Sequence, residues 1–110
     1  MLVKNWGKMP YPKFLQTTYA KIIEDSECIW KGFCYFSWSM KKIQRNDGTE
    51  EKIFARATTD EDIRIFLENY DKVSFVIESM QKEFVIRDVL PSFNPNGNFH
   101  HISLTLLEAI

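Results

Sequence analysis

The chain has 110 residues, enough for one domain with one hydrophobic core, so we treat residues 1–110 as a single domain. Its composition, 45% hydrophobic and 26% charged, excludes a chain that is disordered as a whole, and the aromatic fraction of 15% favours a core rich in sheet. The net charge of −1 lacks the basic excess of a duplex-DNA binder, so nucleic acid is not the partner that we expect.

The first fourteen residues contain two prolines and a glycine, which disfavour a helix. We therefore expect residues 1–14 to form an extended N-terminal arm that docks either on its own core or on a neighbouring subunit. Its large apolar side chains include Trp6, Met9 and Tyr11. Residues 15–24 are ambiguous between helix and strand, and their threonines and isoleucines favour a strand.

The two cysteines, Cys28 and Cys34, are too few for a disulfide scaffold. On one extended strand they would lie roughly 20 Å apart, beyond disulfide reach. We expect two buried free thiols in a reducing compartment. The sequence also starts without the apolar core of a signal peptide, and it has no apolar run long enough for a membrane segment.

Residues 28–43 alternate with a period of two, which predicts a long strand with one dry face. The predicted core face holds Trp30, Gly32, Cys34, Phe36, Trp38 and Met40, and the other face holds Lys31, Phe33, Tyr35, Ser37, Ser39 and Lys41. A glycine inside a strand indicates a bulge or a close approach. An Asn-Asp-Gly turn and a second alternating run, residues 52–58, complete a predicted β-hairpin.

Residues 60–70 carry the pattern of a helix. Thr58 or Thr59 can cap this helix, and Thr58 and Glu61 have the spacing of a capping box. Three acidic residues would suit the helix N-terminus. The apolar stripe expected to face a sheet consists of Ile63, Phe66, Leu67 and Tyr70.

Three further alternating segments, residues 72–79, 82–90 and 100–110, predict strands that pair as an antiparallel meander. The predicted class is therefore α+β: a mainly antiparallel twisted sheet or half-open barrel, with one helix at about 60–70 and a terminal three-strand meander.

No motif declares a reaction, a metal site or a cofactor, so we expect a protein that is not an enzyme and that binds neither. His100 and His101 are the only histidines, and adjacent residues of a strand point to opposite faces, so they are poorly placed to share a metal. The cluster of Asp60, Glu61 and Asp62 is explained by a helix N-terminus without catalysis.

The polar face of residues 28–43 also allows base stacking, because Lys31, Phe33, Tyr35 and Lys41 share it. The stretch KGFCYFSW is loosely similar to the aromatic signature of RNA-recognition sheets, although Cys34 replaces the second small residue and the helix count does not fit. Single-stranded nucleic acid binding is therefore kept as an alternative function.

The C-terminal half, residues 60–108, resembles the tail protein U family of contractile-tailed phages. The matching motifs are Phe75-Val76-Ile77-Glu78, Pro95-Asn96-Gly97 and Ile102-Ser103-Leu104-Thr105-Leu106. The resemblance implies a structural subunit of a tail tube or baseplate that assembles into a ring. It also implies a place in the virion after assembly in the host cytoplasm, and no catalytic residues.

The leading hypothesis is thus a homo-oligomeric structural protein of a phage tail tube, baseplate or related injection particle, whose partners are other copies of itself and neighbouring structural proteins. The candidate interface residues are Trp6, Met9, Tyr11, Phe33, Tyr35, Phe93, Phe99, Leu107 and Ile110. A small soluble phage-encoded binding or inhibitor protein is the rival hypothesis, since it would also expose an apolar patch.

Overall fold

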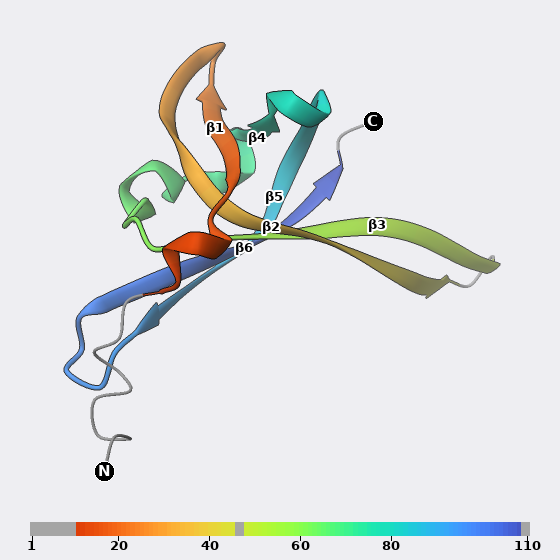
Figure 1. The fold of residues 1–110 in the computed structure, drawn as a ribbon. Coiled ribbons are helices and arrows are strands. Elements are labelled where there is room, and N and C mark those ends of the chain that lie inside the picture. Colours follow the sequence, from red (N-terminus) through yellow and green to blue (C-terminus); the bar gives the residue numbers. More distant parts are fainter. Residues whose placement is uncertain (1–10, 46–47, 109–110) are drawn as a thin grey trace.

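Alternation of apolar and polar side chains produces six strands that close into one antiparallel barrel (Figure 1). The structure is a computed structural model that describes residues 11–45 and 48–108, with only the backbone described for residues 40–53. The strands are β1 (Thr18–Glu24), β2 (Glu27–Arg45), β3 (Gly48–Thr59), β4 (Ser74–Ile77), β5 (Lys82–Phe93) and β6 (Phe99–Glu108).

The strand order around the barrel is β1-β2-β3-β6-β5-β4, and β4 pairs with β1 to close it. The predicted α+β class with a half-open sheet is therefore wrong. Closure depends on Ile22 of β1 lying opposite Phe75 of β4, two residues that are far apart in the sequence. The last three strands pair with one another antiparallel, in the order in which they follow along the chain.

The helix predicted at 60–70 is also wrong, and the described residues contain no α-helix. This segment forms two short 3₁₀ turns, η3 (Arg64–Leu67) and η4 (Tyr70–Lys72), and two others are η2 (Lys13–Leu15) and η5 (Glu78–Met80). The Thr59 hydroxyl accepts a hydrogen bond from the Glu61 amide, and the Asp62 carboxylate accepts one from the Arg64 amide. These local bonds compete with helical ones, and a segment of this length forms a marginal helix in any case.

The apolar stripe read as a helix face still enters the core. Ile63 and Leu67 are buried, while Phe66 and Tyr70 pack against the core from its edge. The turns of residues 60–72 therefore cover one end of the barrel.

No helix of the described chain is long and apolar enough to cross a membrane.

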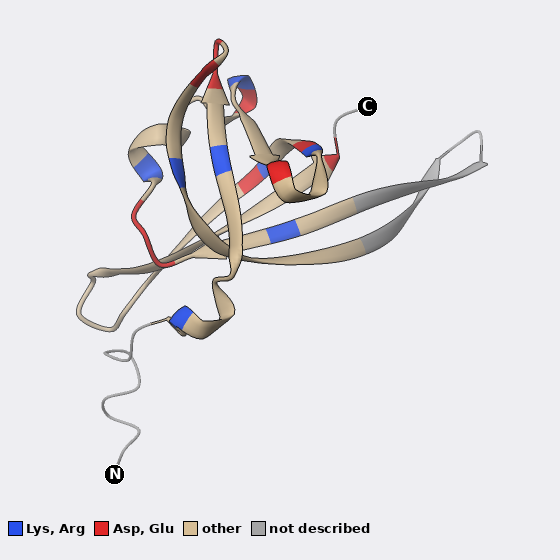
Figure 2. Cartoon of the chain, turned by 45° about the horizontal axis from the view of Figure 1, so that its top comes forward, with Lys and Arg blue, Asp and Glu red and all other residues tan. Residues whose placement is uncertain are grey.

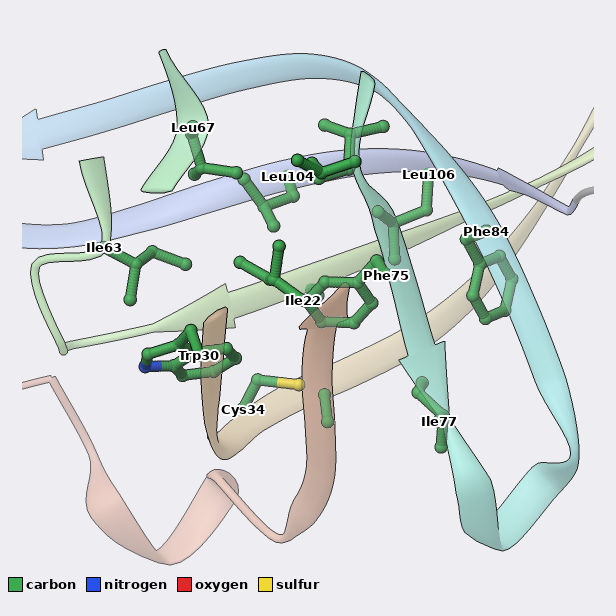
Figure 3. Close-up of a cluster of buried hydrophobic side chains, with 14 of the residues drawn as sticks. Ile22, Trp30, Cys34, Ile63, Leu67, Phe75, Ile77, Phe84, Leu104 and Leu106 are labelled. Carbon is green, nitrogen blue, oxygen red and sulfur yellow. The ribbon is translucent and has the colours of Figure 1, made fainter. Parts of the chain in front are cut away.

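Inward-facing side chains of all six strands fill the barrel (Figure 3). Phe75 and Phe84 are the largest fully buried side chains, and Ile22, Leu104 and Leu106 pack with them. Each such side chain contributes about 1.5–3 kcal/mol when it is removed from water.

Gly32 lies where β2 passes over the indole of Trp30. A Cβ atom at Gly32 would stand 2.6 Å from Cζ2 of that ring, closer than two carbon atoms can pack. The ring is held in place, because Trp30 is buried and its Nε1 donates a hydrogen bond of 2.6 Å to Oε2 of Glu61. Of the two predicted reasons for this glycine, close approach is the correct one. The bulge of the β1–β2 pairing lies at Ile29 of β2, the residue left over between the pairs Ile22–Trp30 and Ile23–Cys28.

The core face predicted for β2 is buried only along the barrel. Trp30 and Cys34 are buried and Phe36 is half-buried, but Trp38 leaves 45% of its surface exposed while it packs on Phe84. The side chain of Met40 and the turn residues 46–47 lie outside the described residues. The burial of β2 therefore declines toward its C-terminal half, where the strand leaves the barrel.

Two hairpins continue past the barrel as two-stranded ribbons (Figure 1). In the first, residues 40–45 of β2 pair only with residues 48–53 of β3 within the described chain, where the pairing of β3 with β6 begins at Phe54. In the second, the β5–β6 hairpin continues to the pair Phe93–Phe99 beyond the last contact of β6 with β3. We call these the β2–β3 ribbon and the β5–β6 ribbon.

Candidate functional site

Three aromatic side chains on the outer face of β1 and β2 are exposed to solvent. Phe33 exposes 55% of its surface, Tyr35 39% and Tyr19 37%. Tyr19 lies directly opposite Phe33 in the β1–β2 register, and their rings meet edge to face with centroids 5.3 Å apart. We call these three residues the aromatic stripe. Exposed neighbouring aromatics of this kind are typical of contact surfaces.

Cations flank the aromatic stripe on both sides. Lys31 precedes Phe33 by two residues and so shares its face, while Arg56 of β3 lies opposite Ser37, two residues beyond Tyr35. Neither cation has an ion-pair partner among the described residues. A shallow groove lined by Ser37, Ser39, Phe54, Ala55, Arg56 and Thr105 continues the surface over β2, β3 and β6.

A second aromatic pair lies on the β5–β6 ribbon. Phe93 and Phe99 meet edge to face, with ring centroids 6.4 Å apart, and both lie against the guanidinium of Arg64, whose Cζ is 5.2 and 5.1 Å from their centroids. Arg64 also makes two hydrogen bonds to the Asp62 carboxylate, which lower the pKa of Asp62. Phe93 and Phe99, two of the candidate interface residues, therefore already have Arg64 as a partner within the chain. This contact holds the turn at 60–67 against the β5–β6 ribbon.

The two histidines share one side of β6, contrary to the prediction. Their Nδ1 atoms are 2.8 Å apart, because the register shifts between Ser92 and Phe93 and leaves His100 as an extra residue opposite β5. Tyr11 packs on His101 with ring centroids 5.0 Å apart, which docks the described end of the N-terminal arm on β6. Burial, and secondarily the charge of His100, lower the pKa of His101.

The structure brings together no set of three metal-ligating side chains among the residues that it describes. The three acids of the predicted helix N-terminus are engaged separately instead. Asp60 pairs with Lys13 at 2.9 Å, Glu61 accepts the hydrogen bond of Trp30, and Asp62 pairs with Arg64. The predicted capping role of Thr58 is wrong, because its hydroxyl lies 3.1 Å from that of Ser103 within the sheet.

The two cysteines differ in exposure, so the prediction that both are buried is wrong for one of them. Cys34 is buried in the core, and burial raises the pKa of its thiol to about 12. Cys28 is exposed near the β1–β2 turn, where its Sγ donates a hydrogen bond to the Trp30 carbonyl. The bulge beside Ile23 ends the strict alternation on which the prediction depended.

Those predicted interface residues that the structure describes do not form one surface. Phe33 and Tyr35 belong to the aromatic stripe, whereas Tyr11, Phe93 and Phe99 are engaged at the β5–β6 end of the molecule, and Leu107 is half-buried opposite Phe54. Trp6, Met9 and Ile110 lie outside the described residues.

Sequence reasoning missed Tyr19 and Arg56 as neighbours of the aromatic stripe. A turn at Asp25-Ser26, read as a regular hairpin, would have paired Tyr19 with Gly32, and only the extra residue Ile29 in β2 shifts Tyr19 opposite Phe33. Pairing of residues 52–58 with the long strand would have placed Arg56 opposite Ser37, beside the aromatic stripe.

No family model, no curated protein and no solved structure matches this chain.

Proposed function

We propose that the chain is a structural subunit that acts by packing against other subunits. The observation that carries the proposal is the β2–β3 ribbon, in which residues 40–45 and 48–53 pair only with each other within the described chain. An isolated two-stranded ribbon is marginal in water, and its outer edges present unpaired backbone donors and acceptors. Such a ribbon gains stability when another chain packs on its faces or pairs with its edges.

The barrel supports the same function because it supplies a rigid base for the ribbon. Its interior is filled by apolar side chains, whereas the aromatic stripe lies on the outer face and Trp38 leaves 45% of its surface exposed. Aromatic side chains that are only partly buried in a free subunit are the usual anchors of protein interfaces.

The resemblance of residues 60–108 to the tail protein U family suggests the setting: a phage tail tube, baseplate or related injection particle. In such a particle each copy would contact further copies and neighbouring structural proteins. The shared motifs lie on β4, on the turn of the β5–β6 hairpin and on β6. This setting is part of the proposal.

Shortening the β2–β3 ribbon tests the function. Met40 and Ile53 are paired in the register, so an Asn-Gly turn can join them directly in place of residues 41–52. The barrel keeps its β3–β6 pairing, and far-ultraviolet circular dichroism should confirm its fold. We expect sedimentation velocity to show concentration-dependent association of the full chain and a loss of association in the shortened chain.

The matched control keeps the ribbon and removes an exposed apolar side chain elsewhere, in the variant Ile65→Ser; Ile65 is exposed on η3. This variant should associate like the full chain. Association of the shortened chain equal to that of the full chain would show that the ribbon does not mediate assembly.

Single-stranded nucleic acid is the second candidate ligand, and one observation favours it. The aromatic stripe lies between two cations, Lys31 and Arg56, as in sheets that stack bases. Fluorescence anisotropy with labelled oligo-dT and oligo-rU tests it. Binding that weakens with added salt and with the variant Phe33→Ser would favour this function, and no binding at low salt would dismiss it.

A further inference from the structure

The β1–β2 hairpin carries two cross-strand pairs of like charge. Lys21 lies opposite Lys31, and Glu24 lies opposite Glu27. Like charges directly opposite each other destabilise a sheet. Figure 2 shows the resulting separation: acidic residues gather at the turn that joins β1 and β2, and basic residues lie further along both strands.

Contacts within the chain compensate these pairs only in part. Lys21 forms an ion pair with Glu78, which raises the pKa of Lys21. The remaining charges, Lys31 on one side and Glu24, Asp25 and Glu27 on the other, have no ion-pair partner in the part of the chain that is described.

The two charged groups form no ion pair with each other among the described residues. Lys21 and Glu24 are three residues apart on one strand, so the alternation of the strand turns their side chains to opposite faces. The acidic group lies at the turn itself, at the far end of the hairpin (Figure 2). Within the described residues, both groups therefore remain available to a partner from another chain.

The shape of the turn suits insertion into a neighbouring surface. Asp25 and Ser26 both have positive φ, 51° and 69°, as expected for the tight two-residue turn of a hairpin. Glu24, Asp25 and Glu27 therefore form a narrow acidic projection, which we call the acidic tip.

We propose that the acidic tip of one copy docks on the aromatic stripe of the next, between Lys31 and Arg56. The inference rests on the proposed assembly function and assigns its contact. The two surfaces are different, so the contact is head-to-tail and builds a ring or an open helical series according to the rotation between copies. Charge complementarity selects this partner, because one chain carries both the uncompensated acids and the uncompensated cations.

The contact also explains why the stripe is aromatic. Tyr19, Phe33 and Tyr35 supply apolar area that loses water when a tip covers it, and the flanking cations meet carboxylates at the rim. A nucleic acid would use the aromatic stripe but would leave the acidic tip without a function.

Charge reversal tests the contact in the full chain. The stripe-reversed variant carries Lys31→Glu with Arg56→Glu, and the tip-reversed variant carries Glu24→Lys with Glu27→Lys. Asp25 stays unchanged, because its positive φ suits aspartate better than lysine. A matched control for the tip-reversed variant, Glu68→Lys with Asp71→Lys, makes the same change in net charge at two exposed acids outside the β1–β2 hairpin.

We expect sedimentation velocity to show that each reversed variant alone associates at least about tenfold more weakly than the natural chain. A mixture of the two variants should regain association, since each tip then meets a stripe of opposite charge. The control should behave like the natural chain. The thermal midpoint of the stripe-reversed variant should be unchanged or higher, because Lys31→Glu removes the like-charge pair with Lys21.

Two outcomes overturn the inference and remain distinguishable. If the natural chain associates and the reversed variants associate equally well, the docking contact is wrong while the assembly function stands. If the natural chain stays a single chain at every concentration and salt level, both are wrong. Loss of oligonucleotide binding in the stripe-reversed variant, without any association of the natural chain, would assign the stripe to nucleic acid instead.

Discussion

Replacing Gly32 with alanine tests whether β2 passes over the Trp30 indole as closely as the structure shows. The new Cβ would stand 2.6 Å from Cζ2 of Trp30, so the ring or the strand must shift. The ring is buried, and its Nε1 is held by Glu61 at 2.6 Å. Either the hydrogen bond lengthens or β2 shifts away from the ring.

The change in the free energy of unfolding caused by Gly32→Ala is the difference between two opposing effects. Overpacking of a filled core costs about 1–3 kcal/mol. Alanine at an ordinary backbone position returns about 0.4–1 kcal/mol by restricting the unfolded chain, and the backbone at Gly32 lies outside the left-handed region. We expect Gly32→Ala to lower the free energy of unfolding by about 1–2 kcal/mol, and each kcal/mol lowers the melting temperature by roughly 4–8 °C in a domain of about this size.

Urea denaturation of four proteins measures this cost: the natural chain, Gly32→Ala, Trp30→Phe and the double variant. Phenylalanine lacks the ring atoms that meet the new methyl group, so alanine at position 32 should cost little or stabilise when Phe replaces Trp30. The reasoning would be refuted if Gly32→Ala stabilised the natural chain, or if it cost the same in both backgrounds.

Three further predictions concern the two cysteine thiols, the imidazole of His101 and the buried side chain of Gln16. An aromatic disulfide reagent at neutral pH should modify Cys28 rapidly and Cys34 only after unfolding, because Cys34 is buried and the pKa of its thiol is raised to about 12. The melting temperature should fall as the pH drops below about 6.5. The pKa of His101 is lowered in the folded state, so below this pH the folded protein binds fewer protons than the unfolded protein. The stability that His101 contributes is therefore complete above about pH 6.5 and is lost as the pH falls further. Gln16→Leu should cost about 1–3 kcal/mol, because it leaves the buried Thr59 hydroxyl and the Asp60 amide without the side-chain oxygen that accepts both hydrogen bonds.

Each of these predictions has a matched control. Cys34→Ala should leave the rapid reaction intact, and equal rates at both thiols would contradict the burial. His101→Gln should reduce the fall of the melting temperature at acidic pH, and an unchanged fall would assign this pH dependence to another group. Gln16→Glu keeps the accepting oxygen and should cost less than Gln16→Leu; the reverse order would contradict the hydrogen bonding described for this side chain.

Local pattern was sufficient to predict the strands that follow residue 27, whereas residues 15–24, which contain β1, stayed ambiguous between helix and strand. Period-two alternation located the long strand of Trp30 and Cys34, its hairpin partner and the C-terminal meander, because burial on one face of a sheet imposes that period directly. The face of Phe33 and Tyr35 also followed from alternation, and both side chains are exposed. Whether that face meets another chain stays a prediction.

Closure of the barrel and the loss of the helix depended on interactions that the sequence does not display. The pairing of Ile22 with Phe75 joins strands that are distant in sequence, and β4 has only four residues to signal it. Residues 60–70 have helical spacing of apolar groups, yet the hydroxyl of Thr59 and the carboxylate of Asp62 bind nearby amides instead. The bulge that places both histidines on one side is likewise a property of pairing, not of local pattern.

The mass of the full chain in solution tests the proposed assembly most directly. Small-angle scattering over a wide concentration range, at low and high salt, gives that mass from the forward intensity. We predict a mass that rises in multiples of one 13.0-kDa chain as concentration increases, and that falls back as salt is added. A constant mass of one chain under all these conditions would contradict the proposal that the protein acts by packing against copies of itself.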